Sequence, residues 1–356
     1  MGYKTKPPFV MPAWVNTSGP SDDVAISTRA RLARNITDSP FPTRARKADL
    51  KRVADLVLDT IYNADERVDK LRIIYPPHLS DSERLALVNS RLASSQQVKG
   101  GRYCPVLLND AGTLSIMVNE EDHLRIQSIL PGLQPLSALQ MAQEFDNAIG
   151  VKIRYAQTDN YGYLTSSLAN IGTGFRVSVM LHLAGLTYLE EAVDVLTAAA
   201  RLKISVRGLF GEGTKAFGDI FQVSNETTMG FTEKEITSRV RAAAEHLVSR
   251  ERAARRKLAA ESKAELAEIM EEIHVRLQAS TALSGREAMA YLSMLRLGSE
   301  IGLGPELTAK QFNEMLVSMQ LSISDSAVSA QQAAGTLRSD IKRAKLVREI
   351  LNLNHT

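Results

Sequence analysis

The stretch IMVNEEDHLRIQ, residues 116–127, places three carboxylates side by side between two apolar runs. They belong to Glu120, Glu121 and Asp122, and Arg125 follows three residues after the last of them. Adjacent carboxylates repel one another, and a protein interior accepts such charges only when they are paired or hydrogen-bonded. The local sequence therefore predicts a site where carboxylates meet a cation.

The overall composition is that of an ordinary globular protein. The chain has 356 residues, of which 44% are hydrophobic and 23% charged, so we expect two domains. A net charge of +3 is too small to indicate a surface dedicated to nucleic acid. No apolar run reaches the roughly 18 residues of a membrane span, and the N-terminus lacks the apolar core of a signal peptide. The single cysteine, Cys104, excludes an internal disulfide, so we expect a cytoplasmic protein without nucleic acid or membrane as a partner.

The pattern of hydrophobic residues changes along the chain. Residues 1–25 are rich in proline and glycine and read as an irregular lead-in. Helical periodicity predicts helices at 47–63 and 81–94. Short strand-like runs separated by Gly, Asn and Asp follow, interrupted by predicted helices at 133–148 and 187–201. From Thr232 onward the pattern is almost entirely helical.

Turn-length spacers separate neighbouring strand-like runs. Residues 104–109 and 113–118 form one such pair, and 151–157 and 161–166 form another, which favours antiparallel pairing. We therefore expect an α+β fold in which helices flank a largely antiparallel sheet, followed by an all-helical C-terminal domain. The predicted boundaries are a lead-in over 1–25, a catalytic domain over 26–245 and the helical domain over 246–356.

Several arginines stand beside strand ends and glycine-rich turns. Arg29 and Arg31 are two apart, which on a strand places both on the same side. Arg176 follows two glycines, and Arg207 precedes three. Guanidinium groups bind phosphate oxygens bidentately, and glycines let backbone N–H groups approach an anion, so the pattern suits a polyphosphate site. A single arginine in such a loop is more often a surface ion pair, and neither a Walker A motif nor protein-kinase signatures are present.

Four stretches together resemble the signature regions of the phosphagen (guanidino) kinase family, which includes arginine and creatine kinases. They are STRARLARN (27–35), NEEDHLRI (119–126), NIGTGFRVSV (170–179) and RGLFGEG with DIFQVSN (207–225), and they occur in the family's order. Within that family the architecture is similar to that of the bacterial protein-arginine kinases. The first signature begins at Ser27, so we expect no N-terminal helical domain of the kind found in the small-molecule kinases, and a helical C-terminal domain is present instead.

The resemblance implies an ATP-dependent kinase that phosphorylates arginine side chains in proteins. It implies ATP and Mg²⁺ as cofactors, with the Mg²⁺ carried by ATP and no metal held by protein side chains. Glu121 is the implied catalytic base, and Glu212 is a second carboxylate that binds the acceptor guanidinium. The implied ATP-binding residues are Ser27, Thr28, Arg29, Ala30, Arg31, Arg91, Arg125, Arg176, Val177, Ser178, Val179, Met180, Arg207, Gly208, Leu209, Phe210, Gly211 and Glu212.

The chain departs from the family pattern at three of its positions. Where the family has a reactive cysteine beside the acceptor, this chain has Ser167, and Leu168 replaces the following proline. A serine hydroxyl donates a hydrogen bond but is no thiolate at neutral pH, so thiol chemistry is not expected here. Arg91 stands where the family has a histidine that contacts the nucleotide.

The segment SDIKRA, residues 339–344, resembles the motif through which protein-arginine kinases bind phospho-arginine allosterically. Ser339 replaces the first arginine of that motif, while Asp340, Arg343 and Ala344 match it. Asp340 and Arg343 are three apart and share a helical face, so one can bind a guanidinium and the other its phosphate. A plain structural alternative is a helix N-terminus capped by Ser339. The resemblance also implies a homodimer or higher homo-oligomer and an activator or adaptor protein as a partner.

Two alternatives to protein-arginine phosphorylation stay open on the sequence. One is a kinase of free arginine or another small guanidino compound. The other is a catalytically inactive module that binds phospho-arginine or a regulator. The two carboxylates and five arginines of the signatures favour an active kinase.

Overall fold

A computed structural model describes residues 11–62, 71–200, 203–208, 216–319 and 330–351. The chain divides into two compact units, which interleave along the sequence. The first unit contains the described parts of Met1–Trp14, Ser27–Val179 and Ser224–Arg241, and the second contains those of Val15–Ile26, Met180–Val223 and Ala242–Thr356. The predicted linear boundaries near residues 25 and 245 stay predictions.

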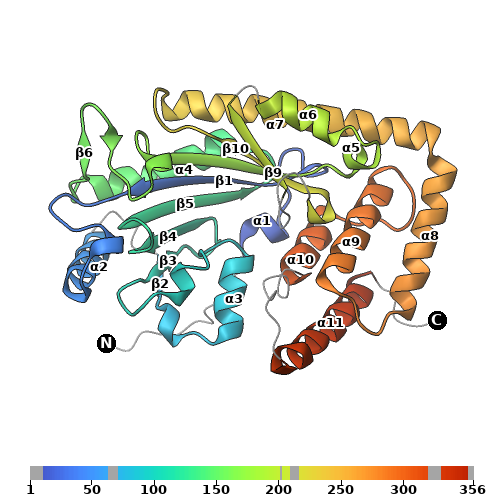
Figure 1. Cartoon of the computed structure of the whole chain (residues 1–356), viewed down its shortest axis with the longest axis horizontal. Helices are drawn as coiled ribbons and strands as arrows, with labels where there is room; N and C mark the ends of the chain where they lie inside the picture. Colours follow the sequence, from blue (N-terminus) through green and yellow to red (C-terminus); the bar gives the residue numbers. More distant parts are fainter. Residues whose placement is uncertain (1–10, 63–70, 201–202, 209–215, 320–329, 352–356) are drawn as a thin grey trace. The chain divides into compact units, whose positions relative to one another are not determined.

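Ten strands are present among the described residues. They are β1 Ala25–Arg34, β2 Arg72–Ile74, β3 Val106–Leu108, β4 Leu114–Val118, β5 Leu124–Pro131, β6 Gln157–Thr158, β7 Gly162–Tyr163, β8 Phe175–His182, β9 Ile204–Gly208 and β10 Ile220–Asn225. The main sheet has eight strands in the order β2-β3-β4-β5-β1-β8-β10-β9, and β6 pairs with β7 in a small sheet (Figure 1). The pairings from β2 through β3, β4 and β5 to β1 are antiparallel, as is β6 with β7, which confirms the predicted fold class.

Most of the described helices lie where the helical patterns predict them, and one, α1, lies instead in the lead-in that was predicted to be irregular. They are α1 Ala13–Asn16, α2 Lys47–Tyr62, α3 Asp81–Asn89, α4 Pro135–Gly150, α5 Ala184–Tyr188, α6 Ala192–Ala200, α7 Glu233–Glu261, α8 Lys263–Ala279, α9 Gly285–Glu300, α10 Ala309–Met319 and α11 Ala330–Ile350. Helix α3 begins with a capping box, in which Ser80 caps the helix and the Glu83 side chain accepts from the Ser80 backbone N–H at 2.8 Å. The all-helical pattern after Thr232 is confirmed among the described residues.

Two predicted elements were wrong in detail. The helix predicted over 187–201 is two helices, α5 and α6, separated at Glu190, whose φ of +59° is incompatible with a continuous right-handed helix. In the strand predicted over 151–157, only Gln157 lies in a strand, because the end of α4 continues into a turn there.

In the first unit, the side chains of β1 alternate between the two faces of the sheet. Ala30 lies opposite Ser128 of β5, and the Ser128 hydroxyl donates to the Ala138 carbonyl of α4 at 2.5 Å. Helix α4 therefore covers the face that carries Ala30 (Figure 1). Arg29 and Arg31 belong to the opposite face, as their two-residue spacing predicts.

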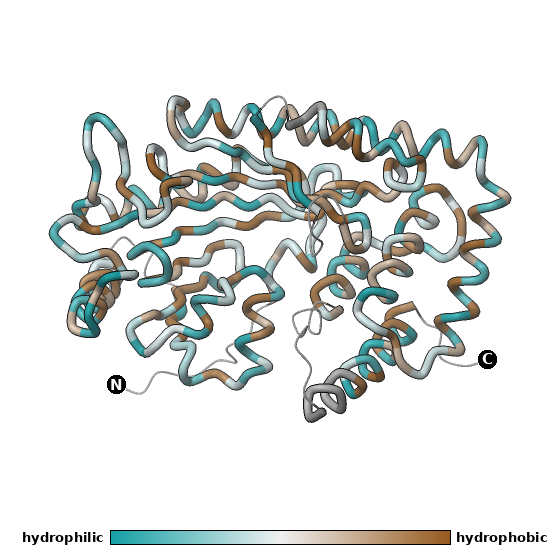
Figure 2. Tube along the Cα trace, viewed as in Figure 1, coloured by the Kyte–Doolittle hydropathy of each residue, from teal (hydrophilic) through white to brown (hydrophobic). Residues whose placement is uncertain are grey.

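In the second unit, the helices α8 to α11 alternate hydrophobic and hydrophilic residues along their length (Figure 2). Many of their apolar residues are buried, and Leu266 of α8 and Leu297 of α9 form a core cluster with Leu258 of α7 and Ala184 of α5. This burial, rather than helix propensity, supplies most of the stability of such helices. Among the helices that the structure describes, none is both long and apolar enough to cross a membrane.

Candidate active site

The three adjacent carboxylates lie on the tight turn between β4 and β5. Asn119 opens the turn in the left-handed conformation, with φ of +55°, which asparagine tolerates better than most residues. Its backbone N–H donates to the His123 carbonyl at 2.9 Å, and that of Glu120 donates to the Asp122 carbonyl at 3.1 Å. The turn therefore holds its three carboxylates in fixed and different directions.

Two of the three carboxylates are satisfied within the protein. Glu120 pairs with Arg125, whose Nη1 lies 2.9 Å from Glu120 Oε1. Asp122 is 2% exposed, and its Oδ1 accepts from Asn35 Nδ2 at 2.6 Å and from the Ser166 backbone N–H at 2.7 Å. Both therefore act as structural groups that position the turn.

Glu121 is the carboxylate that remains accessible. Its side chain is 35% exposed, and its Oε2 lies 3.4 Å from Arg125 Nη2. Its backbone carbonyl accepts from the Ser166 hydroxyl at 2.7 Å, which fixes the residue in place. Partial burial raises the pKa of Glu121, and the negative charge of Asp122 raises it further. A carboxylate with a raised pKa is better suited to accept a proton near neutral pH.

Five arginines gather on the face of the sheet opposite α4. Adjacent strands β5, β1 and β8 carry four of them, and Arg125 of β5 lies opposite Ala33 of β1. Ala33 in turn donates its N–H to the Gly174 carbonyl at the start of β8. At Gly174 a side chain would meet the Ala33 carbonyl, and φ is +63°, so the glycine is required for this approach. The five are Arg29, Arg31, Arg91, Arg125 and Arg176.

The clustered arginines are buried and repel one another, an arrangement that a bound anion would stabilise. Burial lowers the pKa of Arg31 to about 9 and that of Arg91 to about 10. The pKa of Arg29 is also lowered, first by burial and then by the positive charges of the other four arginines. The Nε atoms of Arg31 and Arg91 are buried, and within the described part of the chain neither has a hydrogen-bond partner. Buried cations and donors in such numbers fit a polyphosphate ligand.

A cavity of about 110 Å³ brings the accessible carboxylate and the arginines together. Glu121 and Ser167 contribute to its wall, next to the guanidinium groups of three of the clustered arginines. A cation bound at Glu121 would thus lie beside an anion bound by the arginines. The lining residues are Arg31, Ala33, Glu121, Arg125, Ser167, Asn170, Gly174 and Arg176.

The other residues implied to bind ATP have different surroundings. Ser27, Thr28, Ala30, Val177, Ser178 and Val179 are buried side chains of β1 and β8. The Thr28 hydroxyl donates to the Gly132 carbonyl at 2.6 Å and so ties β1 to the segment that precedes α4. Met180, Arg207 and Gly208 belong to the second unit, where Arg207 is exposed on β9. Leu209, Phe210, Gly211 and Glu212 lie outside the described residues.

Two residues that the sequence analysis missed position the site. Asn35 holds Asp122 with its amide, and its Oδ1 accepts from the His123 backbone N–H at 2.9 Å. Ser94 donates to Glu120 Oε1 at 2.5 Å. Asn35 is the last residue of the first signature, STRARLARN, and this position could have indicated its role. The sequence around Ser94 gives no indication of its partner. Among the described residues no three His, Cys, Asp or Glu side chains are grouped to hold a metal ion.

The C-terminal motif lies within a continuous helix. Helix α11 begins at Ala330, so the alternative interpretation of Ser339 as its N-cap was wrong. Arg343 Nη1 donates to Asp340 Oδ1 at 2.7 Å and also to the Leu283 carbonyl. Ala344 is fully buried. Asp340 and Arg343 therefore share a face, as predicted, and contact one another.

Two family models match the sequence. The model described as ATP:guanido phosphotransferase, C-terminal catalytic domain, matches residues 52–254, more than half of the chain. The model described as protein-arginine kinase McsB C-terminal domain matches residues 273–356.

Curated relatives match along nearly the whole chain. A protein-arginine kinase of Halothermothrix orenii is 36% identical over 340 residues, which cover 96% of each chain. One of Desulforamulus reducens is 38% identical over 341 residues, 95% of each chain.

Solved structures share the fold. The duplicated taurocyamine kinase of Schistosoma mansoni has a TM-score of 0.59 at 25% identity, covering 66% of this chain and 34% of that one. A lombricine kinase has a TM-score of 0.58 at 21% identity, covering 68% and 69% of the two chains. The fold, the grouped signature residues and the full-length matches agree that this chain belongs to the guanidino kinase family and, within it, to the protein-arginine kinases.

Proposed function

We propose that the protein transfers the γ-phosphoryl group of ATP to arginine side chains of other proteins. The observation that carries the proposal is the cavity where Glu121 stands beside Arg31, Arg125 and Arg176. A carboxylate binds a guanidinium, and arginines bind a polyphosphate, so the two reactants meet there. Family membership along the whole chain supports the same reaction.

Glu121 is the proposed catalytic base. A guanidinium has a pKa above about 12 and no available lone pair, so an N–H proton must leave as the N–P bond forms. The Glu121 carboxylate accepts this proton, while the bond between the γ-phosphorus and the bridging oxygen breaks and ADP leaves. Its ion pair with Arg125 Nη2, at 3.4 Å, links the acceptor side of the cavity to the phosphate side. Ser167 and Asn170 line the acceptor side and can donate or accept hydrogen bonds.

The arginine cluster is proposed to hold the phosphates in line for transfer. Arg31, Arg125 and Arg176 neutralise charge that develops on the γ-phosphoryl group, which is the main source of catalysis in phosphoryl transfer. Mg²⁺ enters with ATP and supplies further charge neutralisation. Arg29 and Arg91 are proposed to bind the remaining phosphates, and Arg207 and Glu212 stay predictions as nucleotide and acceptor ligands.

Incubation with Mg-ATP and a loosely folded protein tests the proposal. We expect acid-labile phosphate on arginine side chains, detected by mass spectrometry before and after mild acid. Free arginine in a parallel reaction distinguishes a kinase of small guanidino compounds, which would phosphorylate it at least as well. The Glu121→Gln variant is the matched control, because it retains the shape of the side chain without a basic carboxylate.

The cellular setting is proposed from the family. A cytoplasmic location fits the single cysteine and the ATP requirement. The match of residues 273–356 to a protein-arginine kinase domain supports regulation through that region, with phospho-arginine bound at Asp340 and Arg343. A homo-oligomer and a regulatory adaptor protein belong to the same proposal.

A further inference from the structure

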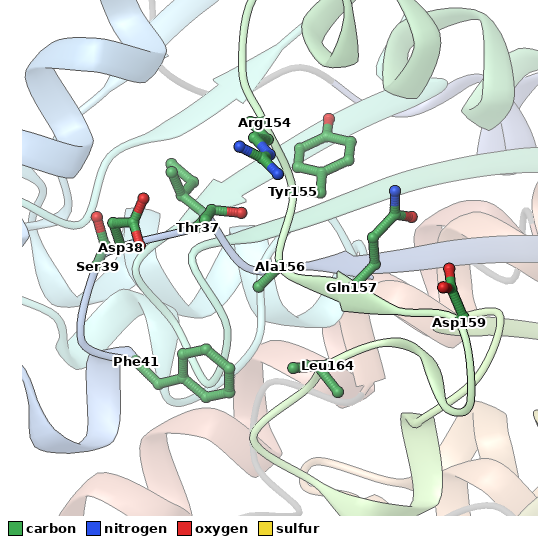
Figure 3. Close-up of a pocket in the computed structure, with 11 residues that line it drawn as sticks. Thr37, Asp38, Ser39, Phe41, Arg154, Tyr155, Ala156, Gln157, Asp159 and Leu164 are labelled. Carbon is green, nitrogen blue, oxygen red and sulfur yellow. The ribbon is translucent and has the colours of Figure 1, made fainter.

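A second and larger cavity in the first unit lies next to the candidate active site. It is a groove of about 420 Å³, well above the roughly 110 Å³ of the cavity at Glu121. Two segments form its walls, residues 36–41 and residues 154–164 (Figure 3). The described structure and the proposed chemistry leave this groove without a role.

The groove and the active-site cavity share two short pieces of chain. Ala33 lines the cavity, and Ile36 lines the groove. Ser167 lines the cavity, and Leu164 lines the groove. In each piece the residue that lines the cavity and the residue that lines the groove are three positions apart, which is at most about 10 Å of extended chain. A polypeptide whose arginine lies in the cavity can therefore reach the groove with its next few residues.

Hydrogen bonds fix these two pieces of chain side by side. Asn35 Nδ2 donates both to the Leu164 carbonyl, at 3.1 Å, and to Asp122 Oδ1, at 2.6 Å. Ala156 donates its backbone N–H to the Asn35 carbonyl at 2.7 Å, and Leu164 donates to the Ala156 carbonyl at 2.9 Å. The groove is therefore preformed, and its wall is continuous with the turn that holds Glu121. Preformed sites bind ligands at a lower entropic cost.

The lining of the groove suits a polypeptide better than a single ion. Figure 3 shows Asp38 near one end and Asp159 near the other, with Arg154 and Gln157 between them. All four side chains are exposed. They offer both donors and acceptors, which an extended backbone with alternating N–H and C=O groups requires. A phosphate site would gather cations and a metal site carboxylates, and this groove does neither.

An apolar surface completes the groove. Phe41 and Leu164 both line it and lie on the same side in Figure 3. The Phe41 ring also packs edge-on against His123 of the β4–β5 turn, with ring centroids 6.2 Å apart. An apolar side chain that neighbours the acceptor arginine in a polypeptide would find a partner here.

We infer that the groove binds the polypeptide that flanks the acceptor arginine, in extended form. The inference rests on the proposed function and names its substrate class more closely. The arginine side chain enters the cavity at Glu121, and residues on one side of it lie between the 36–41 and 154–164 segments. A free guanidino compound fills the cavity alone and gains nothing from the groove.

Filling the groove tests the inference. Gln157 is exposed on β6, so Gln157→Trp adds bulk within the groove, and Val151→Trp adds a similar ring at a position that is 86% exposed outside it. The acceptors are N-acetylarginine amide and a nine-residue peptide with one central arginine. We expect Gln157→Trp to lower kcat/KM for the peptide about tenfold and to leave the short acceptor unchanged. Val151→Trp should leave both acceptors unchanged.

A binding measurement separates this inference from the proposed reaction. Fluorescence anisotropy of the labelled peptide, without ATP, should show about tenfold weaker binding to Gln157→Trp than to the wild type. In one outcome the wild type binds the peptide without transferring phosphate to it. If Gln157→Trp then binds the peptide more weakly, the groove stands and the proposed reaction fails. If the substitution affects both acceptors equally, or leaves peptide binding and transfer unchanged, the groove does not bind the acceptor.

Discussion

Two groups of buried arginines in this protein have opposite surroundings. In the first unit, Arg29 and Arg31 lie among other arginines, and burial, followed by the charges of these arginines, lowers the pKa of both. In the second unit, Arg255 Nε lies 2.7 Å from Glu251 Oε1, and Arg296 Nη2 lies 2.6 Å from Glu300 Oε1. Arg29 and Arg31 are thus surrounded mainly by like charges, whereas Arg255 and Arg296 form close ion pairs.

The difference indicates which arginines serve the fold and which serve a ligand. In a buried pair of an arginine and a carboxylate, each group neutralises the charge of the other. Removing the arginine leaves the carboxylate buried and without a counter-charge. A cluster of repelling arginines contributes no such stability and costs free energy until an anion binds. Arginines of the cluster and arginines in buried ion pairs should therefore respond to substitution in opposite ways.

The largest effect should follow the loss of the proposed base. In Glu121→Gln we expect kcat for phosphoryl transfer to fall about 10²–10⁴-fold, because the amide cannot accept the proton. ATP binding, measured by calorimetry, should stay close to that of the wild type. Near-normal turnover in this variant would refute the assignment of Glu121.

Removing a paired arginine should destabilise the fold. Glu251 is fully buried and also accepts the backbone N–H groups of Gly185, at 2.8 Å, and Leu186, at 2.9 Å. In Arg255→Met the Glu251 charge loses its cation, so we expect the free energy of unfolding to fall by about 3–5 kcal/mol. Urea denaturation measures this loss. A decrease below about 1 kcal/mol would show that the pair contributes little to stability.

Removing a clustered arginine should spare the fold and weaken nucleotide binding. In Arg31→Met one charge-assisted contact to phosphate is lost, which corresponds to about 1.5–3 kcal/mol of binding free energy. The melting temperature without nucleotide should be unchanged or higher, because repulsion within the cluster decreases. Calorimetry with Mg-ATP measures the loss of nucleotide affinity, and a thermal melt measures the melting temperature. A large drop in melting temperature with intact ATP affinity would show that Arg31 serves the fold and not the nucleotide.

Much of this fold was accessible from the sequence because its elements are locally encoded. Alternating residues in 26–35 placed Arg29 and Arg31 on one side, and β1 confirms it. The turn-length spacer between 104–109 and 113–118 predicted the antiparallel pair of β3 and β4. Short-range patterns of this kind depend on the period of a strand or helix and not on distant contacts.

What the sequence did not predict depends on contacts between distant residues. Arg34 belongs to the same run as Arg31, yet it is 1% exposed and pairs with Asp146 of α4, 2.6 Å away. Nothing local distinguishes these two arginines except the side of the strand on which they lie. The hydrogen bond between Ser94 and Glu120 likewise joins residues that are 26 positions apart in the sequence. The break at Glu190 was missed because helical periodicity continues through it.

A smaller effect concerns pH and sharpens the role of the carboxylate turn. The pKa of Glu121 is raised above its ordinary value of 4.5 by burial and by Asp122. Since the base must be deprotonated, kcat/KM should rise with pH through this raised pKa and fall off in acid at a higher pH than for an ordinary glutamate. Asp122→Asn keeps the acceptor oxygen and removes the charge, so it should move this acidic limb to lower pH. An unchanged pH–rate profile would show that another group limits the rate in acid.

The smallest expected effect concerns the C-terminal helix and tests whether a paired arginine also binds a ligand. Arg343 is 4% exposed and already contacts Asp340 and the Leu283 carbonyl. A phospho-arginine must displace these contacts before Asp340 can bind its guanidinium and Arg343 its phosphate. In addition, Ser339 stands where the motif has an arginine, so one charge-assisted contact is absent.

We therefore expect weak binding of a phospho-arginine peptide, with a Kd of about 1 mM, which corresponds to roughly −4 kcal/mol. Asp340→Ala should abolish it, and Lys342→Ala, which removes a charge from an exposed position of the same helix, should leave it intact. Calorimetric titration of the three proteins provides the comparison. Equal binding by the wild type and Asp340→Ala would exclude this site. No binding at millimolar peptide would place Arg343 with the other paired arginines of the second unit, as an ion pair that holds α11 to the segment before α9.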